Sequence, residues 1–176
     1  MITLRSMPAP VWESRFDSYN CEMEIKNKDG KIIHESRNPH NFDDLDLRGA
    51  VLEGVVLQGA HFDDSNLEGA NLRGADFYWG NFFRANLTGA DLENARLQGA
   101  DLKEANLTNA NLRNANLGRD NVGGSTQLQG ARLEGARLEG TILEGAEYDA
   151  DTLFPIRFDP HKSKMVLKQS SRSDKS

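Results

Sequence analysis

The side chains that could carry out catalysis or hold a cofactor are few and scattered in this sequence. Its four histidines are His34, His40, His61 and His161. None of them has the His-x-x-x-His spacing that places two imidazoles on one metal ion. The single cysteine, Cys21, has no neighbouring basic residue or histidine to activate its thiol, and the run Gly123-Gly124-Ser125-Thr126 lacks the spacing and the lysine of a phosphate-binding loop. We therefore predict no catalytic residues, no cofactor and no enzymatic activity.

Acidic residues recur twenty positions apart, which would stack their carboxylates if the chain turned back on itself every twenty residues. The two pairs are Asp43 with Asp63, and Asp44 with Asp64. Converging carboxylates are typical of calcium sites. The second row continues through Arg84 and Glu104, however, so an arginine is available to neutralise the acids. We predict an acidic surface here and no bound metal.

The composition narrows the class of protein. A chain of 176 residues is one domain long, and its hydrophobic share of 38% is below the roughly 45–50% of ordinary globular domains. With 27% charged residues and a net charge of only −6, it does not resemble a disordered chain. One cysteine excludes an internal disulfide. No apolar run approaches the roughly 18 residues of a membrane span and no secretory signal is evident, so we expect a cytoplasmic protein.

A repeat of five residues dominates the sequence. From Phe42 to Val122 a large apolar residue returns at every fifth position, usually preceded by Ala and then Asp or Asn, as in Ala70-Asn71-Leu72. A six-residue step from Val122 to Leu128 interrupts the repeat once, and we interpret residues 118–126 as a bulged corner or short loop. The repeat then resumes through Leu133, Leu138, Leu143 and Tyr148.

A period of five fits neither an α-helix nor a β-strand. On a helix, steps of about 500° would spread the apolar residues around the whole circumference. A chain that turns a corner every five residues would instead point each of them inward. Four such sides close a coil of about twenty residues, and successive coils would stack like parallel strands at about 4.8 Å.

The tandem motif Ala-(Asp/Asn)-Leu-x-x, from about Asn41 to Ala150, resembles the pentapeptide-repeat family. The resemblance implies an all-β fold, a right-handed quadrilateral parallel β-helix. Gyrase-binding members of the family, which protect against fluoroquinolones, are similar to DNA in shape and charge and are typically dimers joined through a C-terminal module. The ending of this chain, with Phe154-Pro155 and Phe158-Asp159-Pro160, does not evidently match that module.

Residues twenty apart should share one side of the coil. The predicted core columns are Phe42, Phe62 and Phe82, and Leu52, Leu72, Leu92 and Leu112. Glycine, or Asn94, Asn109 and Asn114, follows two residues after most inward residues, where a type II turn needs a positive φ. On one side Asp44, Asp64, Arg84 and Glu104 occupy that position, which we interpret as a different type of turn.

The ends of the coil need caps, because stacked coils leave unpaired backbone at each end. Residues 1–40 are predicted as an N-terminal cap with a β-hairpin over about 12–36, turning at Lys28-Asp29-Gly30. Residues 41–150 form the β-helix and 151–160 a C-terminal cap, where Pro155 and Pro160 stop pairing. Residues 161–176 carry five Lys or Arg and one Asp, and we predict a flexible basic tail.

One stretch places aromatic residues outside. Phe77 and Phe82 point inward by the repeat, and Gly80 leaves room for their rings. Tyr78, Trp79 and Phe83, with Arg84 beside them, then lie on the surface as a candidate partner-binding patch. The alternative is that these rings cover glycine backbone or pack against the N-terminal hairpin.

The leading functional hypothesis is a non-enzymatic scaffold that presents a rigid surface to a protein partner of unknown identity. The alternative, suggested by the resemblance, is a DNA-mimicking modulator of a type II topoisomerase, since residues 41–160 contain 20 acidic and 10 basic residues. Acidic outward residues also keep a repeat protein soluble, which is the simpler explanation. Under both hypotheses we expect no direct nucleic-acid binding and no membrane contact.

Overall fold

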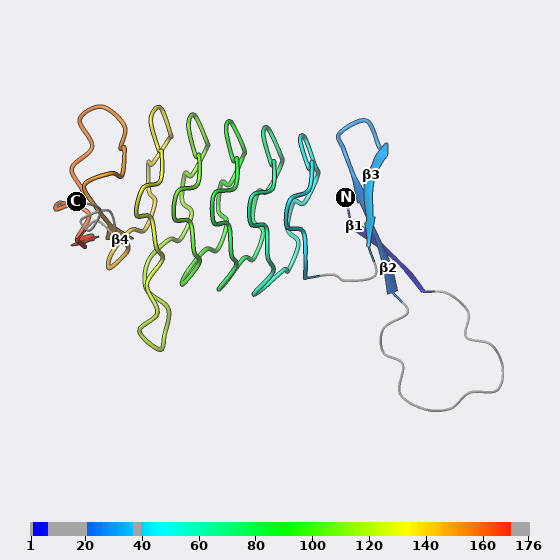
Figure 1. Ribbon diagram of the computed structural model, residues 1–176, viewed down its shortest axis with the longest axis horizontal. Coiled ribbons are helices and arrows are strands. Elements are labelled where there is room, and N and C mark those ends of the chain that lie inside the picture. Colours follow the sequence, from blue (N-terminus) through cyan, green and yellow to red (C-terminus); the bar gives the residue numbers. More distant parts are fainter. Residues whose placement is uncertain (1, 7–20, 37–39, 170–176) are drawn as a thin grey trace, which may run out of the picture.

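A computed structural model describes residues 2–6, 21–36 and 40–169 of the chain. From residue 41 the chain winds into a stack of four-sided coils along the long axis of the molecule (Figure 1). Parallel β-bridges join residues twenty apart, beginning with Asn41 and His61. Each side of a coil contributes one such bridge and two or three backbone hydrogen bonds to the next coil, such as Phe42 N–H to His61 C=O at 2.8 Å. The chain is therefore an all-β, right-handed quadrilateral β-helix, which confirms the predicted fold.

The core consists of columns of stacked side chains. The rings of Phe42, Phe62 and Phe82 lie 4.7 and 4.8 Å apart and almost parallel, because the spacing of the coils sets the spacing of the rings. Phe77 packs edge-on against the Phe62 and Phe82 rings. A Cβ at Gly80 would lie only 3.0 Å from the Phe82 ring, so glycine is what makes room for the two rings. The leucine column is also fully buried, and consists of Leu52, Leu72, Leu92 and Leu112.

The corners of the coil share one backbone conformation. The corner glycines and Asn94, Asn109 and Asn114 have positive φ, as the turn requires. The prediction of a different type of turn at the acidic corner is wrong. The φ angles of Asp44, Asp64, Arg84 and Glu104 lie between 55° and 58°, so they are positive as at the other corners. Each of these four residues donates its backbone N–H to a carbonyl of the next coil. The hydrogen-bond ladder thus imposes the left-handed conformation on residues that otherwise avoid it.

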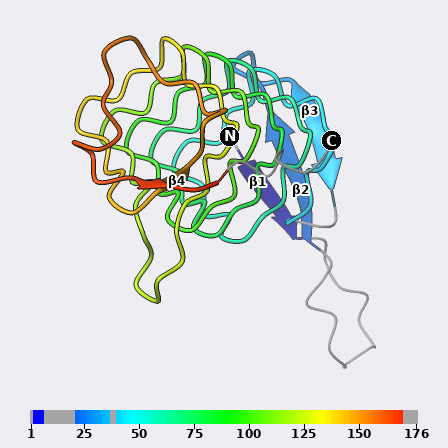
Figure 2. The ribbon, with the colours of Figure 1, turned by 60° about the vertical axis from the view of Figure 1, so that its left-hand side comes forward.

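The interruption in the repeat is a loop that projects from the coil (Figures 1 and 2). Before it, bridged residues are twenty apart; across it they are 26 apart, as with Asp101 and Gln127. Six residues are therefore extra. Val122 was expected to point inward, but 81% of its surface is exposed. The expectation fails because Thr126 and Leu128, both fully buried, fill the next small and large inward positions.

A three-stranded antiparallel sheet covers the first coil. Strands β1 (Ile2–Ser6), β2 (Cys21–Lys26) and β3 (Ile32–Ser36) lie in the order β1-β2-β3. Strands β2 and β3 form the expected hairpin about Gly30, while β1 was not predicted. Ile25 is fully buried, and Asn27 forms an antiparallel bridge with Ala50 of the first coils. Residues 12–20 of the expected hairpin lie outside the described part.

The other end is closed by the C-terminal segment. Strand β4 (Glu147–Tyr148) pairs in parallel with β5 (Val166–Leu167). Phe154 stacks on Phe158 at 5.0 Å and meets the Tyr148 ring edge-on. Residues 161–169 therefore pack against the coil instead of forming the start of a flexible tail, because Met165 is buried and β5 takes up backbone bonds that β4 would otherwise leave open. Residues 170–176 of that tail lie outside the described part.

Within the described residues, no helix has the length and hydrophobicity that crossing a membrane requires.

Candidate functional site

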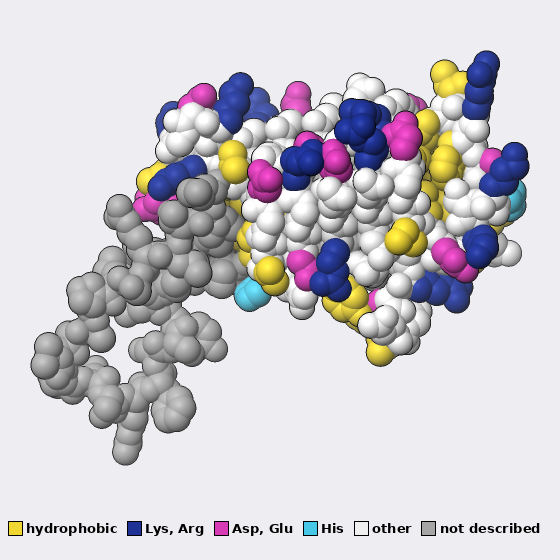
Figure 3. Space-filling model, turned by 180° about the vertical axis from the view of Figure 1, so that it is seen from behind, with side chains coloured by type: hydrophobic (Ala, Val, Ile, Leu, Met, Phe, Trp, Pro, Cys, Tyr) yellow, Lys and Arg dark blue, Asp and Glu magenta, His cyan; other side chains and the backbone are white. Residues whose placement is uncertain are grey.

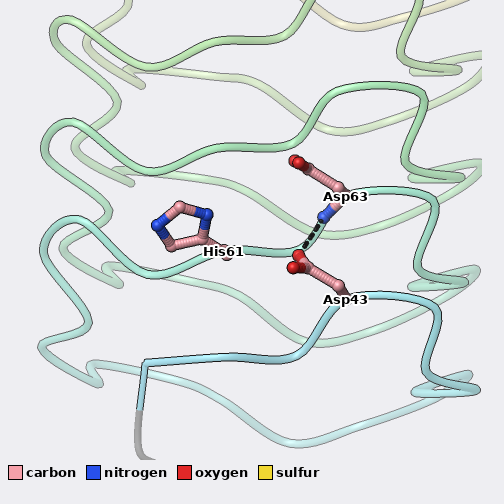
Figure 4. Close-up of side chains that lie close together, drawn as sticks. All are labelled: Asp43, His61 and Asp63. Atoms are coloured by element: carbon pink, nitrogen blue, oxygen red, sulfur yellow. Dashed lines mark hydrogen bonds between the residues drawn. The ribbon is translucent and has the colours of Figure 1, made fainter.

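The acidic residues near the N-terminal end of the coil form a cluster with a histidine (Figure 4). Asp43, His61 and Asp63 each offer a ligand atom, and these atoms lie within 4.8 Å of one another. The Asp63 N–H donates to Asp43 Oδ1 at 2.8 Å, and Asn81 donates to Asp63 Oδ2 at 2.9 Å. The sequence predicted that Asp43 and Asp63 stack, but it did not indicate that His61 lies beside them. His61 is two residues before Asp63 on the same side of the coil.

The electrostatics of this cluster are those of acids held close together. Burial raises the pKa of Asp63, the neighbouring Asp43 raises it further, and His61 acts in the opposite direction. Asp44 and Asp64 lie one row away, where the Arg84 guanidinium donates to both oxygens of Asp64 at 2.8 and 2.5 Å. Hydrogen bonds within the coil thus account for Asp43 Oδ1 and Asp63 Oδ2, whereas the buried Asp63 Oδ1 has no hydrogen-bond partner in the described part of the chain. In the neighbouring row, Arg84 neutralises Asp64.

The four residues of the predicted aromatic patch form two pairs. Tyr78 and Trp79 lie on the Phe77 side of the coil, with their ring centroids 6.4 Å apart. Phe83 and Arg84 lie on the adjacent Phe82 side, with the guanidinium 4.7 Å from the Phe83 ring centroid. Trp79 and Arg84 therefore occupy the two corners that bound the Phe82 side, and both have a positive φ. Tyr78 and Phe83 are half-buried, whereas Trp79 is 52% exposed.

Trp79 packs on the projecting loop. Its ring lies over Gly99 and Gly124, so close that a Cβ on Gly99 would lie 3.0 Å from the indole Nε1 and a Cβ on Gly124 would lie 3.2 Å from Cζ2. The corner row that contains Trp79 has glycine at positions 59 and 99. A tryptophan with φ of 58° is unusual, because bulky residues seldom adopt the left-handed region. The structure thus agrees with the alternative that this ring covers glycine backbone, yet half of its surface stays exposed.

The loop is held in shape by Asp120. Its Oδ1 accepts hydrogen bonds from the backbone N–H groups of Val122 at 2.9 Å and Gly124 at 2.6 Å. Burial by itself would raise the pKa of Asp120, but these N–H groups and the Trp79 indole outweigh it and hold the pKa below its usual value. At the base of the loop, Thr126 donates to the carbonyls of Leu97 and Gly118. The loop is therefore fixed to the coil at several points.

Exposed apolar residues lie around this loop. Val122, near its tip, is 81% exposed, and Ile142, whose Cγ2 approaches the loop at Gly118, is 51% exposed. Seen from behind, hydrophobic side chains lie at the base and near the tip of the projecting loop (Figure 3). We name Trp79, Val122 and Ile142 together the Trp79 surface. Sequence reasoning found only the first of them, although the departure from the five-residue period marked the loop.

Comparison with known families identifies the repeat. The family model described as pentapeptide repeats matches eight copies, over residues 41–77, 81–119 and 125–147. The matched segments cover more than half of the chain, and the chain belongs to the pentapeptide-repeat family. The match is interrupted at residues 78–80 and 120–124. The first gap contains Trp79 and the second contains most of the loop on which Trp79 packs.

Solved structures of two cyanobacterial proteins are similar. HetL, a pentapeptide repeat protein involved in heterocyst differentiation regulation from Nostoc sp. strain PCC 7120, is 33% identical with a TM-score of 0.60, over 62% of this chain and 46% of HetL. Rfr23 from Cyanothece 51142 is 39% identical with a TM-score of 0.52, over 56% of this chain and 63% of Rfr23. This chain thus spans about half the length of HetL and less than two thirds of Rfr23.

A more distant likeness concerns QnrB1, a plasmid-mediated fluoroquinolone resistance protein. The two chains are 21% identical with a TM-score of 0.28, over 73% of this chain and 80% of the QnrB1 chain, so the likeness carries no argument about function. No curated protein matches this sequence.

Replacing Asp63 by Asn should raise the melting temperature near neutral pH. Because the pKa of Asp63 is raised in the folded protein, stability falls as the pH rises from the unfolded pKa, about 3.9, through the folded pKa. An asparagine at this position cannot ionise, and its amide oxygen can still accept from Asn81. Thermal unfolding of both proteins from about pH 3 to about pH 7 should show a difference that grows with pH. A gain of the same size at every pH would contradict this explanation.

Replacing Gly99 by Ala should destabilise the protein more than replacing Gly59 by Ala. Both glycines are in the corner row of Trp79 and have positive φ, so each alanine costs about 1–2 kcal/mol from its backbone conformation. Only at Gly99 would the new Cβ meet the Trp79 ring, while nothing lies within 4 Å at Gly59. Thermal unfolding and indole fluorescence, in a Trp12→Phe background, measure the difference. Equal destabilisation with unchanged fluorescence would show that Trp79 does not pack on Gly99.

Proposed function

We propose that this protein is a non-enzymatic scaffold that binds another protein through the Trp79 surface, and that it acts in the cytoplasm. The observation that carries the proposal is the coincidence of the two interruptions in the family match with that surface. Residues 78–80 and 120–124 are far apart in sequence, yet Trp79 contacts Gly124. The chain therefore departs from the repeat at two places that lie on one surface. A binding site for a specific partner is expected where the sequence departs from the repeat, because the repeat itself only builds the coil.

The energetics of Trp79 support a binding role. Glycine would occupy its corner without strain, as at Gly59 and Gly99, whereas a bulky residue in the left-handed region costs about 1–3 kcal/mol. Packing on Gly99 and Gly124 accounts for one half of the ring, but the exposed half gains nothing from the fold. Partly exposed tryptophans beside apolar neighbours are typical of binding hot spots. The Asp120 hydrogen bonds hold the loop in one conformation, which lowers the entropic cost of binding.

The comparison with HetL is consistent with a binding role. HetL is involved in heterocyst differentiation regulation, and its coil matches 62% of this chain. We extend from HetL only the involvement of a pentapeptide-repeat protein in regulation, and we argue the contact with a partner from the Trp79 surface alone.

The gyrase-modulator alternative has less support from the surface charge. Residues 41–160 carry 20 acidic and 10 basic side chains over about six coils, or roughly 29 Å at about 4.8 Å per coil. Duplex DNA carries about 17 negative charges over that length, whereas 10 basic and 20 acidic residues give this segment a net charge of only −10. Many of the acids here are also paired: Arg73 bonds to Asp91 and Glu93. A supercoiling assay with purified gyrase tests this alternative, and inhibition at stoichiometric amounts of the protein would favour it.

The scaffold proposal predicts that Trp79→Ala combined with Val122→Ser abolishes partner binding and leaves the coil intact. The control is Val56→Ser, because Val56 is 69% exposed in the same row as Ile142 but lies at the other end of the coil. Immobilised wild-type protein and the Val56 variant should recover the same partner from a lysate of the source cells. The double variant should lose at least about 30-fold in affinity, as expected for hot-spot residues worth 2 kcal/mol or more.

The circular dichroism spectrum of the double variant should match that of the wild type. Retention of the partner by a folded double variant, or equal loss of the partner by the Val56 variant, would contradict the proposal.

A further inference from the structure

A polar cavity of about 170 Å³ opens at the corner of the Phe82 side that is opposite to Trp79. We name it the Phe83 pocket, and its lining includes Phe83, Lys103, Glu104, Gln129, Asp149 and Asp151. Gly130, which also lines it, takes the corner position that Arg84 and Glu104 take in the coils before it. A Cβ on Gly130 would already lie 3.3 Å from Glu104 Cγ. The Glu104 side chain thus lies over Gly130, which has no side chain of its own to cover the corner.

The charge of the pocket is negative. Glu104, Asp149 and Asp151 contribute three carboxylates, and the one ammonium, that of Lys103, pairs with Asp101 at 2.9 Å. Asp149 is only 5% exposed, and its Oδ1 is fixed by the N–H groups of Gly130 and Asp151 and by the Thr152 hydroxyl. A rigid carboxylate in a partly enclosed site favours a cation over an anion or a neutral group.

An amide oxygen in the lining lacks a donor. Gln129 Nε2 donates to Glu147 Oε2 at 3.2 Å, which orients the amide and leaves Oε1 as an acceptor. This Oε1 is buried and has no hydrogen-bond donor within the part of the chain that the structure describes. A buried acceptor without a donor costs about 1–3 kcal/mol, and the partial negative charge of this Oε1 adds to that of the carboxylates around the pocket.

The remaining wall is aromatic. One guanidinium, that of Arg84, already lies 4.7 Å from the Phe83 ring centroid, a cation–π contact. The ring also offers apolar surface to the methylene groups of a long basic side chain. The cavity volume of about 170 Å³ is below the roughly 300–1,000 Å³ of pockets that hold drug-sized ligands. It is enough for a guanidinium and part of its stem, and too little for a nucleotide or another drug-sized ligand.

We infer that the Phe83 pocket binds a guanidinium group, carried by an arginine side chain of the protein partner. The inference rests on the proposed function, and it specifies the partner further. Trp79 and the Phe83 pocket lie at the two corners of one side of the coil. A partner that lies across this side would place an apolar patch on the Trp79 surface and an arginine in the pocket.

The pocket itself is tested with N-acetyl-arginine amide and its neutral analogue N-acetyl-citrulline amide. In amide NMR spectra of the full chain, the arginine compound should shift the Gly130 backbone and Gln129 side-chain signals with a Kd of the order of 1 mM. The citrulline compound should not shift them. The double variant Glu104→Gln/Asp151→Asn should weaken arginine binding at least about tenfold, while Glu68→Gln, a change to an exposed acid on another side, should not. Equal shifts with both compounds, or unchanged binding by the double variant, would overturn the inference.

The source of the arginine is tested with the captured partner. The Glu104→Gln/Asp151→Asn variant should lose partner affinity, and N-acetyl-arginine amide should compete for binding to the wild type. If this variant binds the partner as tightly as the wild type, the assignment of the arginine to the partner is overturned. Failure of the scaffold proposal is distinguishable, because Trp79→Ala/Val122→Ser leaves the pocket intact and should keep its affinity for the arginine compound.

Discussion

The backbone hydrogen bonds between successive coils are the constraint on which the rest of this structure depends. Each side of a coil has five residues and two or three such bonds, and each coil is held mainly by its neighbours. Because the ladder fixes the coil spacing, it also fixes the spacing of the side chains inside. The phenylalanine rings stack at 4.7 and 4.8 Å for this reason, and no ordinary layered core is present in the described residues.

The same constraint determines what the outside can display. Every outward residue lies in a row with the residues twenty before and after it, so most outward contacts are with neighbours in the same row or side. Arg84 binds Asp64 and Arg96 binds Asp76 in this way. A distinctive surface therefore needs a departure from the repeat. In this chain the departures are Trp79 and the six-residue insertion, and Gly130, which follows Glu104 in its row, lines the Phe83 pocket.

Much of this architecture can be predicted from the sequence, because the period specifies the register directly. The inward columns, the corner glycines and the space left by Gly80 all follow from the five-residue period. The acidic corners could not be predicted, since Asp44 and Arg84 adopt a conformation that their own preferences oppose and the ladder imposes. The exposed position of Val122 could not be predicted either. Val122 follows the five-residue spacing, but it lies in the loop that projects from the coil. The contacts of Trp79 with Gly124 and of β5 with β4 depend on tertiary packing, for which the sequence offers no period.

The central claim is that the Trp79 surface is preformed on a rigid coil, and amide hydrogen exchange in the free protein tests it most directly. The N–H groups of Val122 and Gly124 lie in a projecting loop, yet both donate to Asp120. If the loop is fixed as described, both amides should exchange at least about 100-fold more slowly than in an unstructured peptide. Exchange at the unstructured rate, with the amide of Leu92 in the coil still protected, would show that the loop is not preformed and would contradict the account.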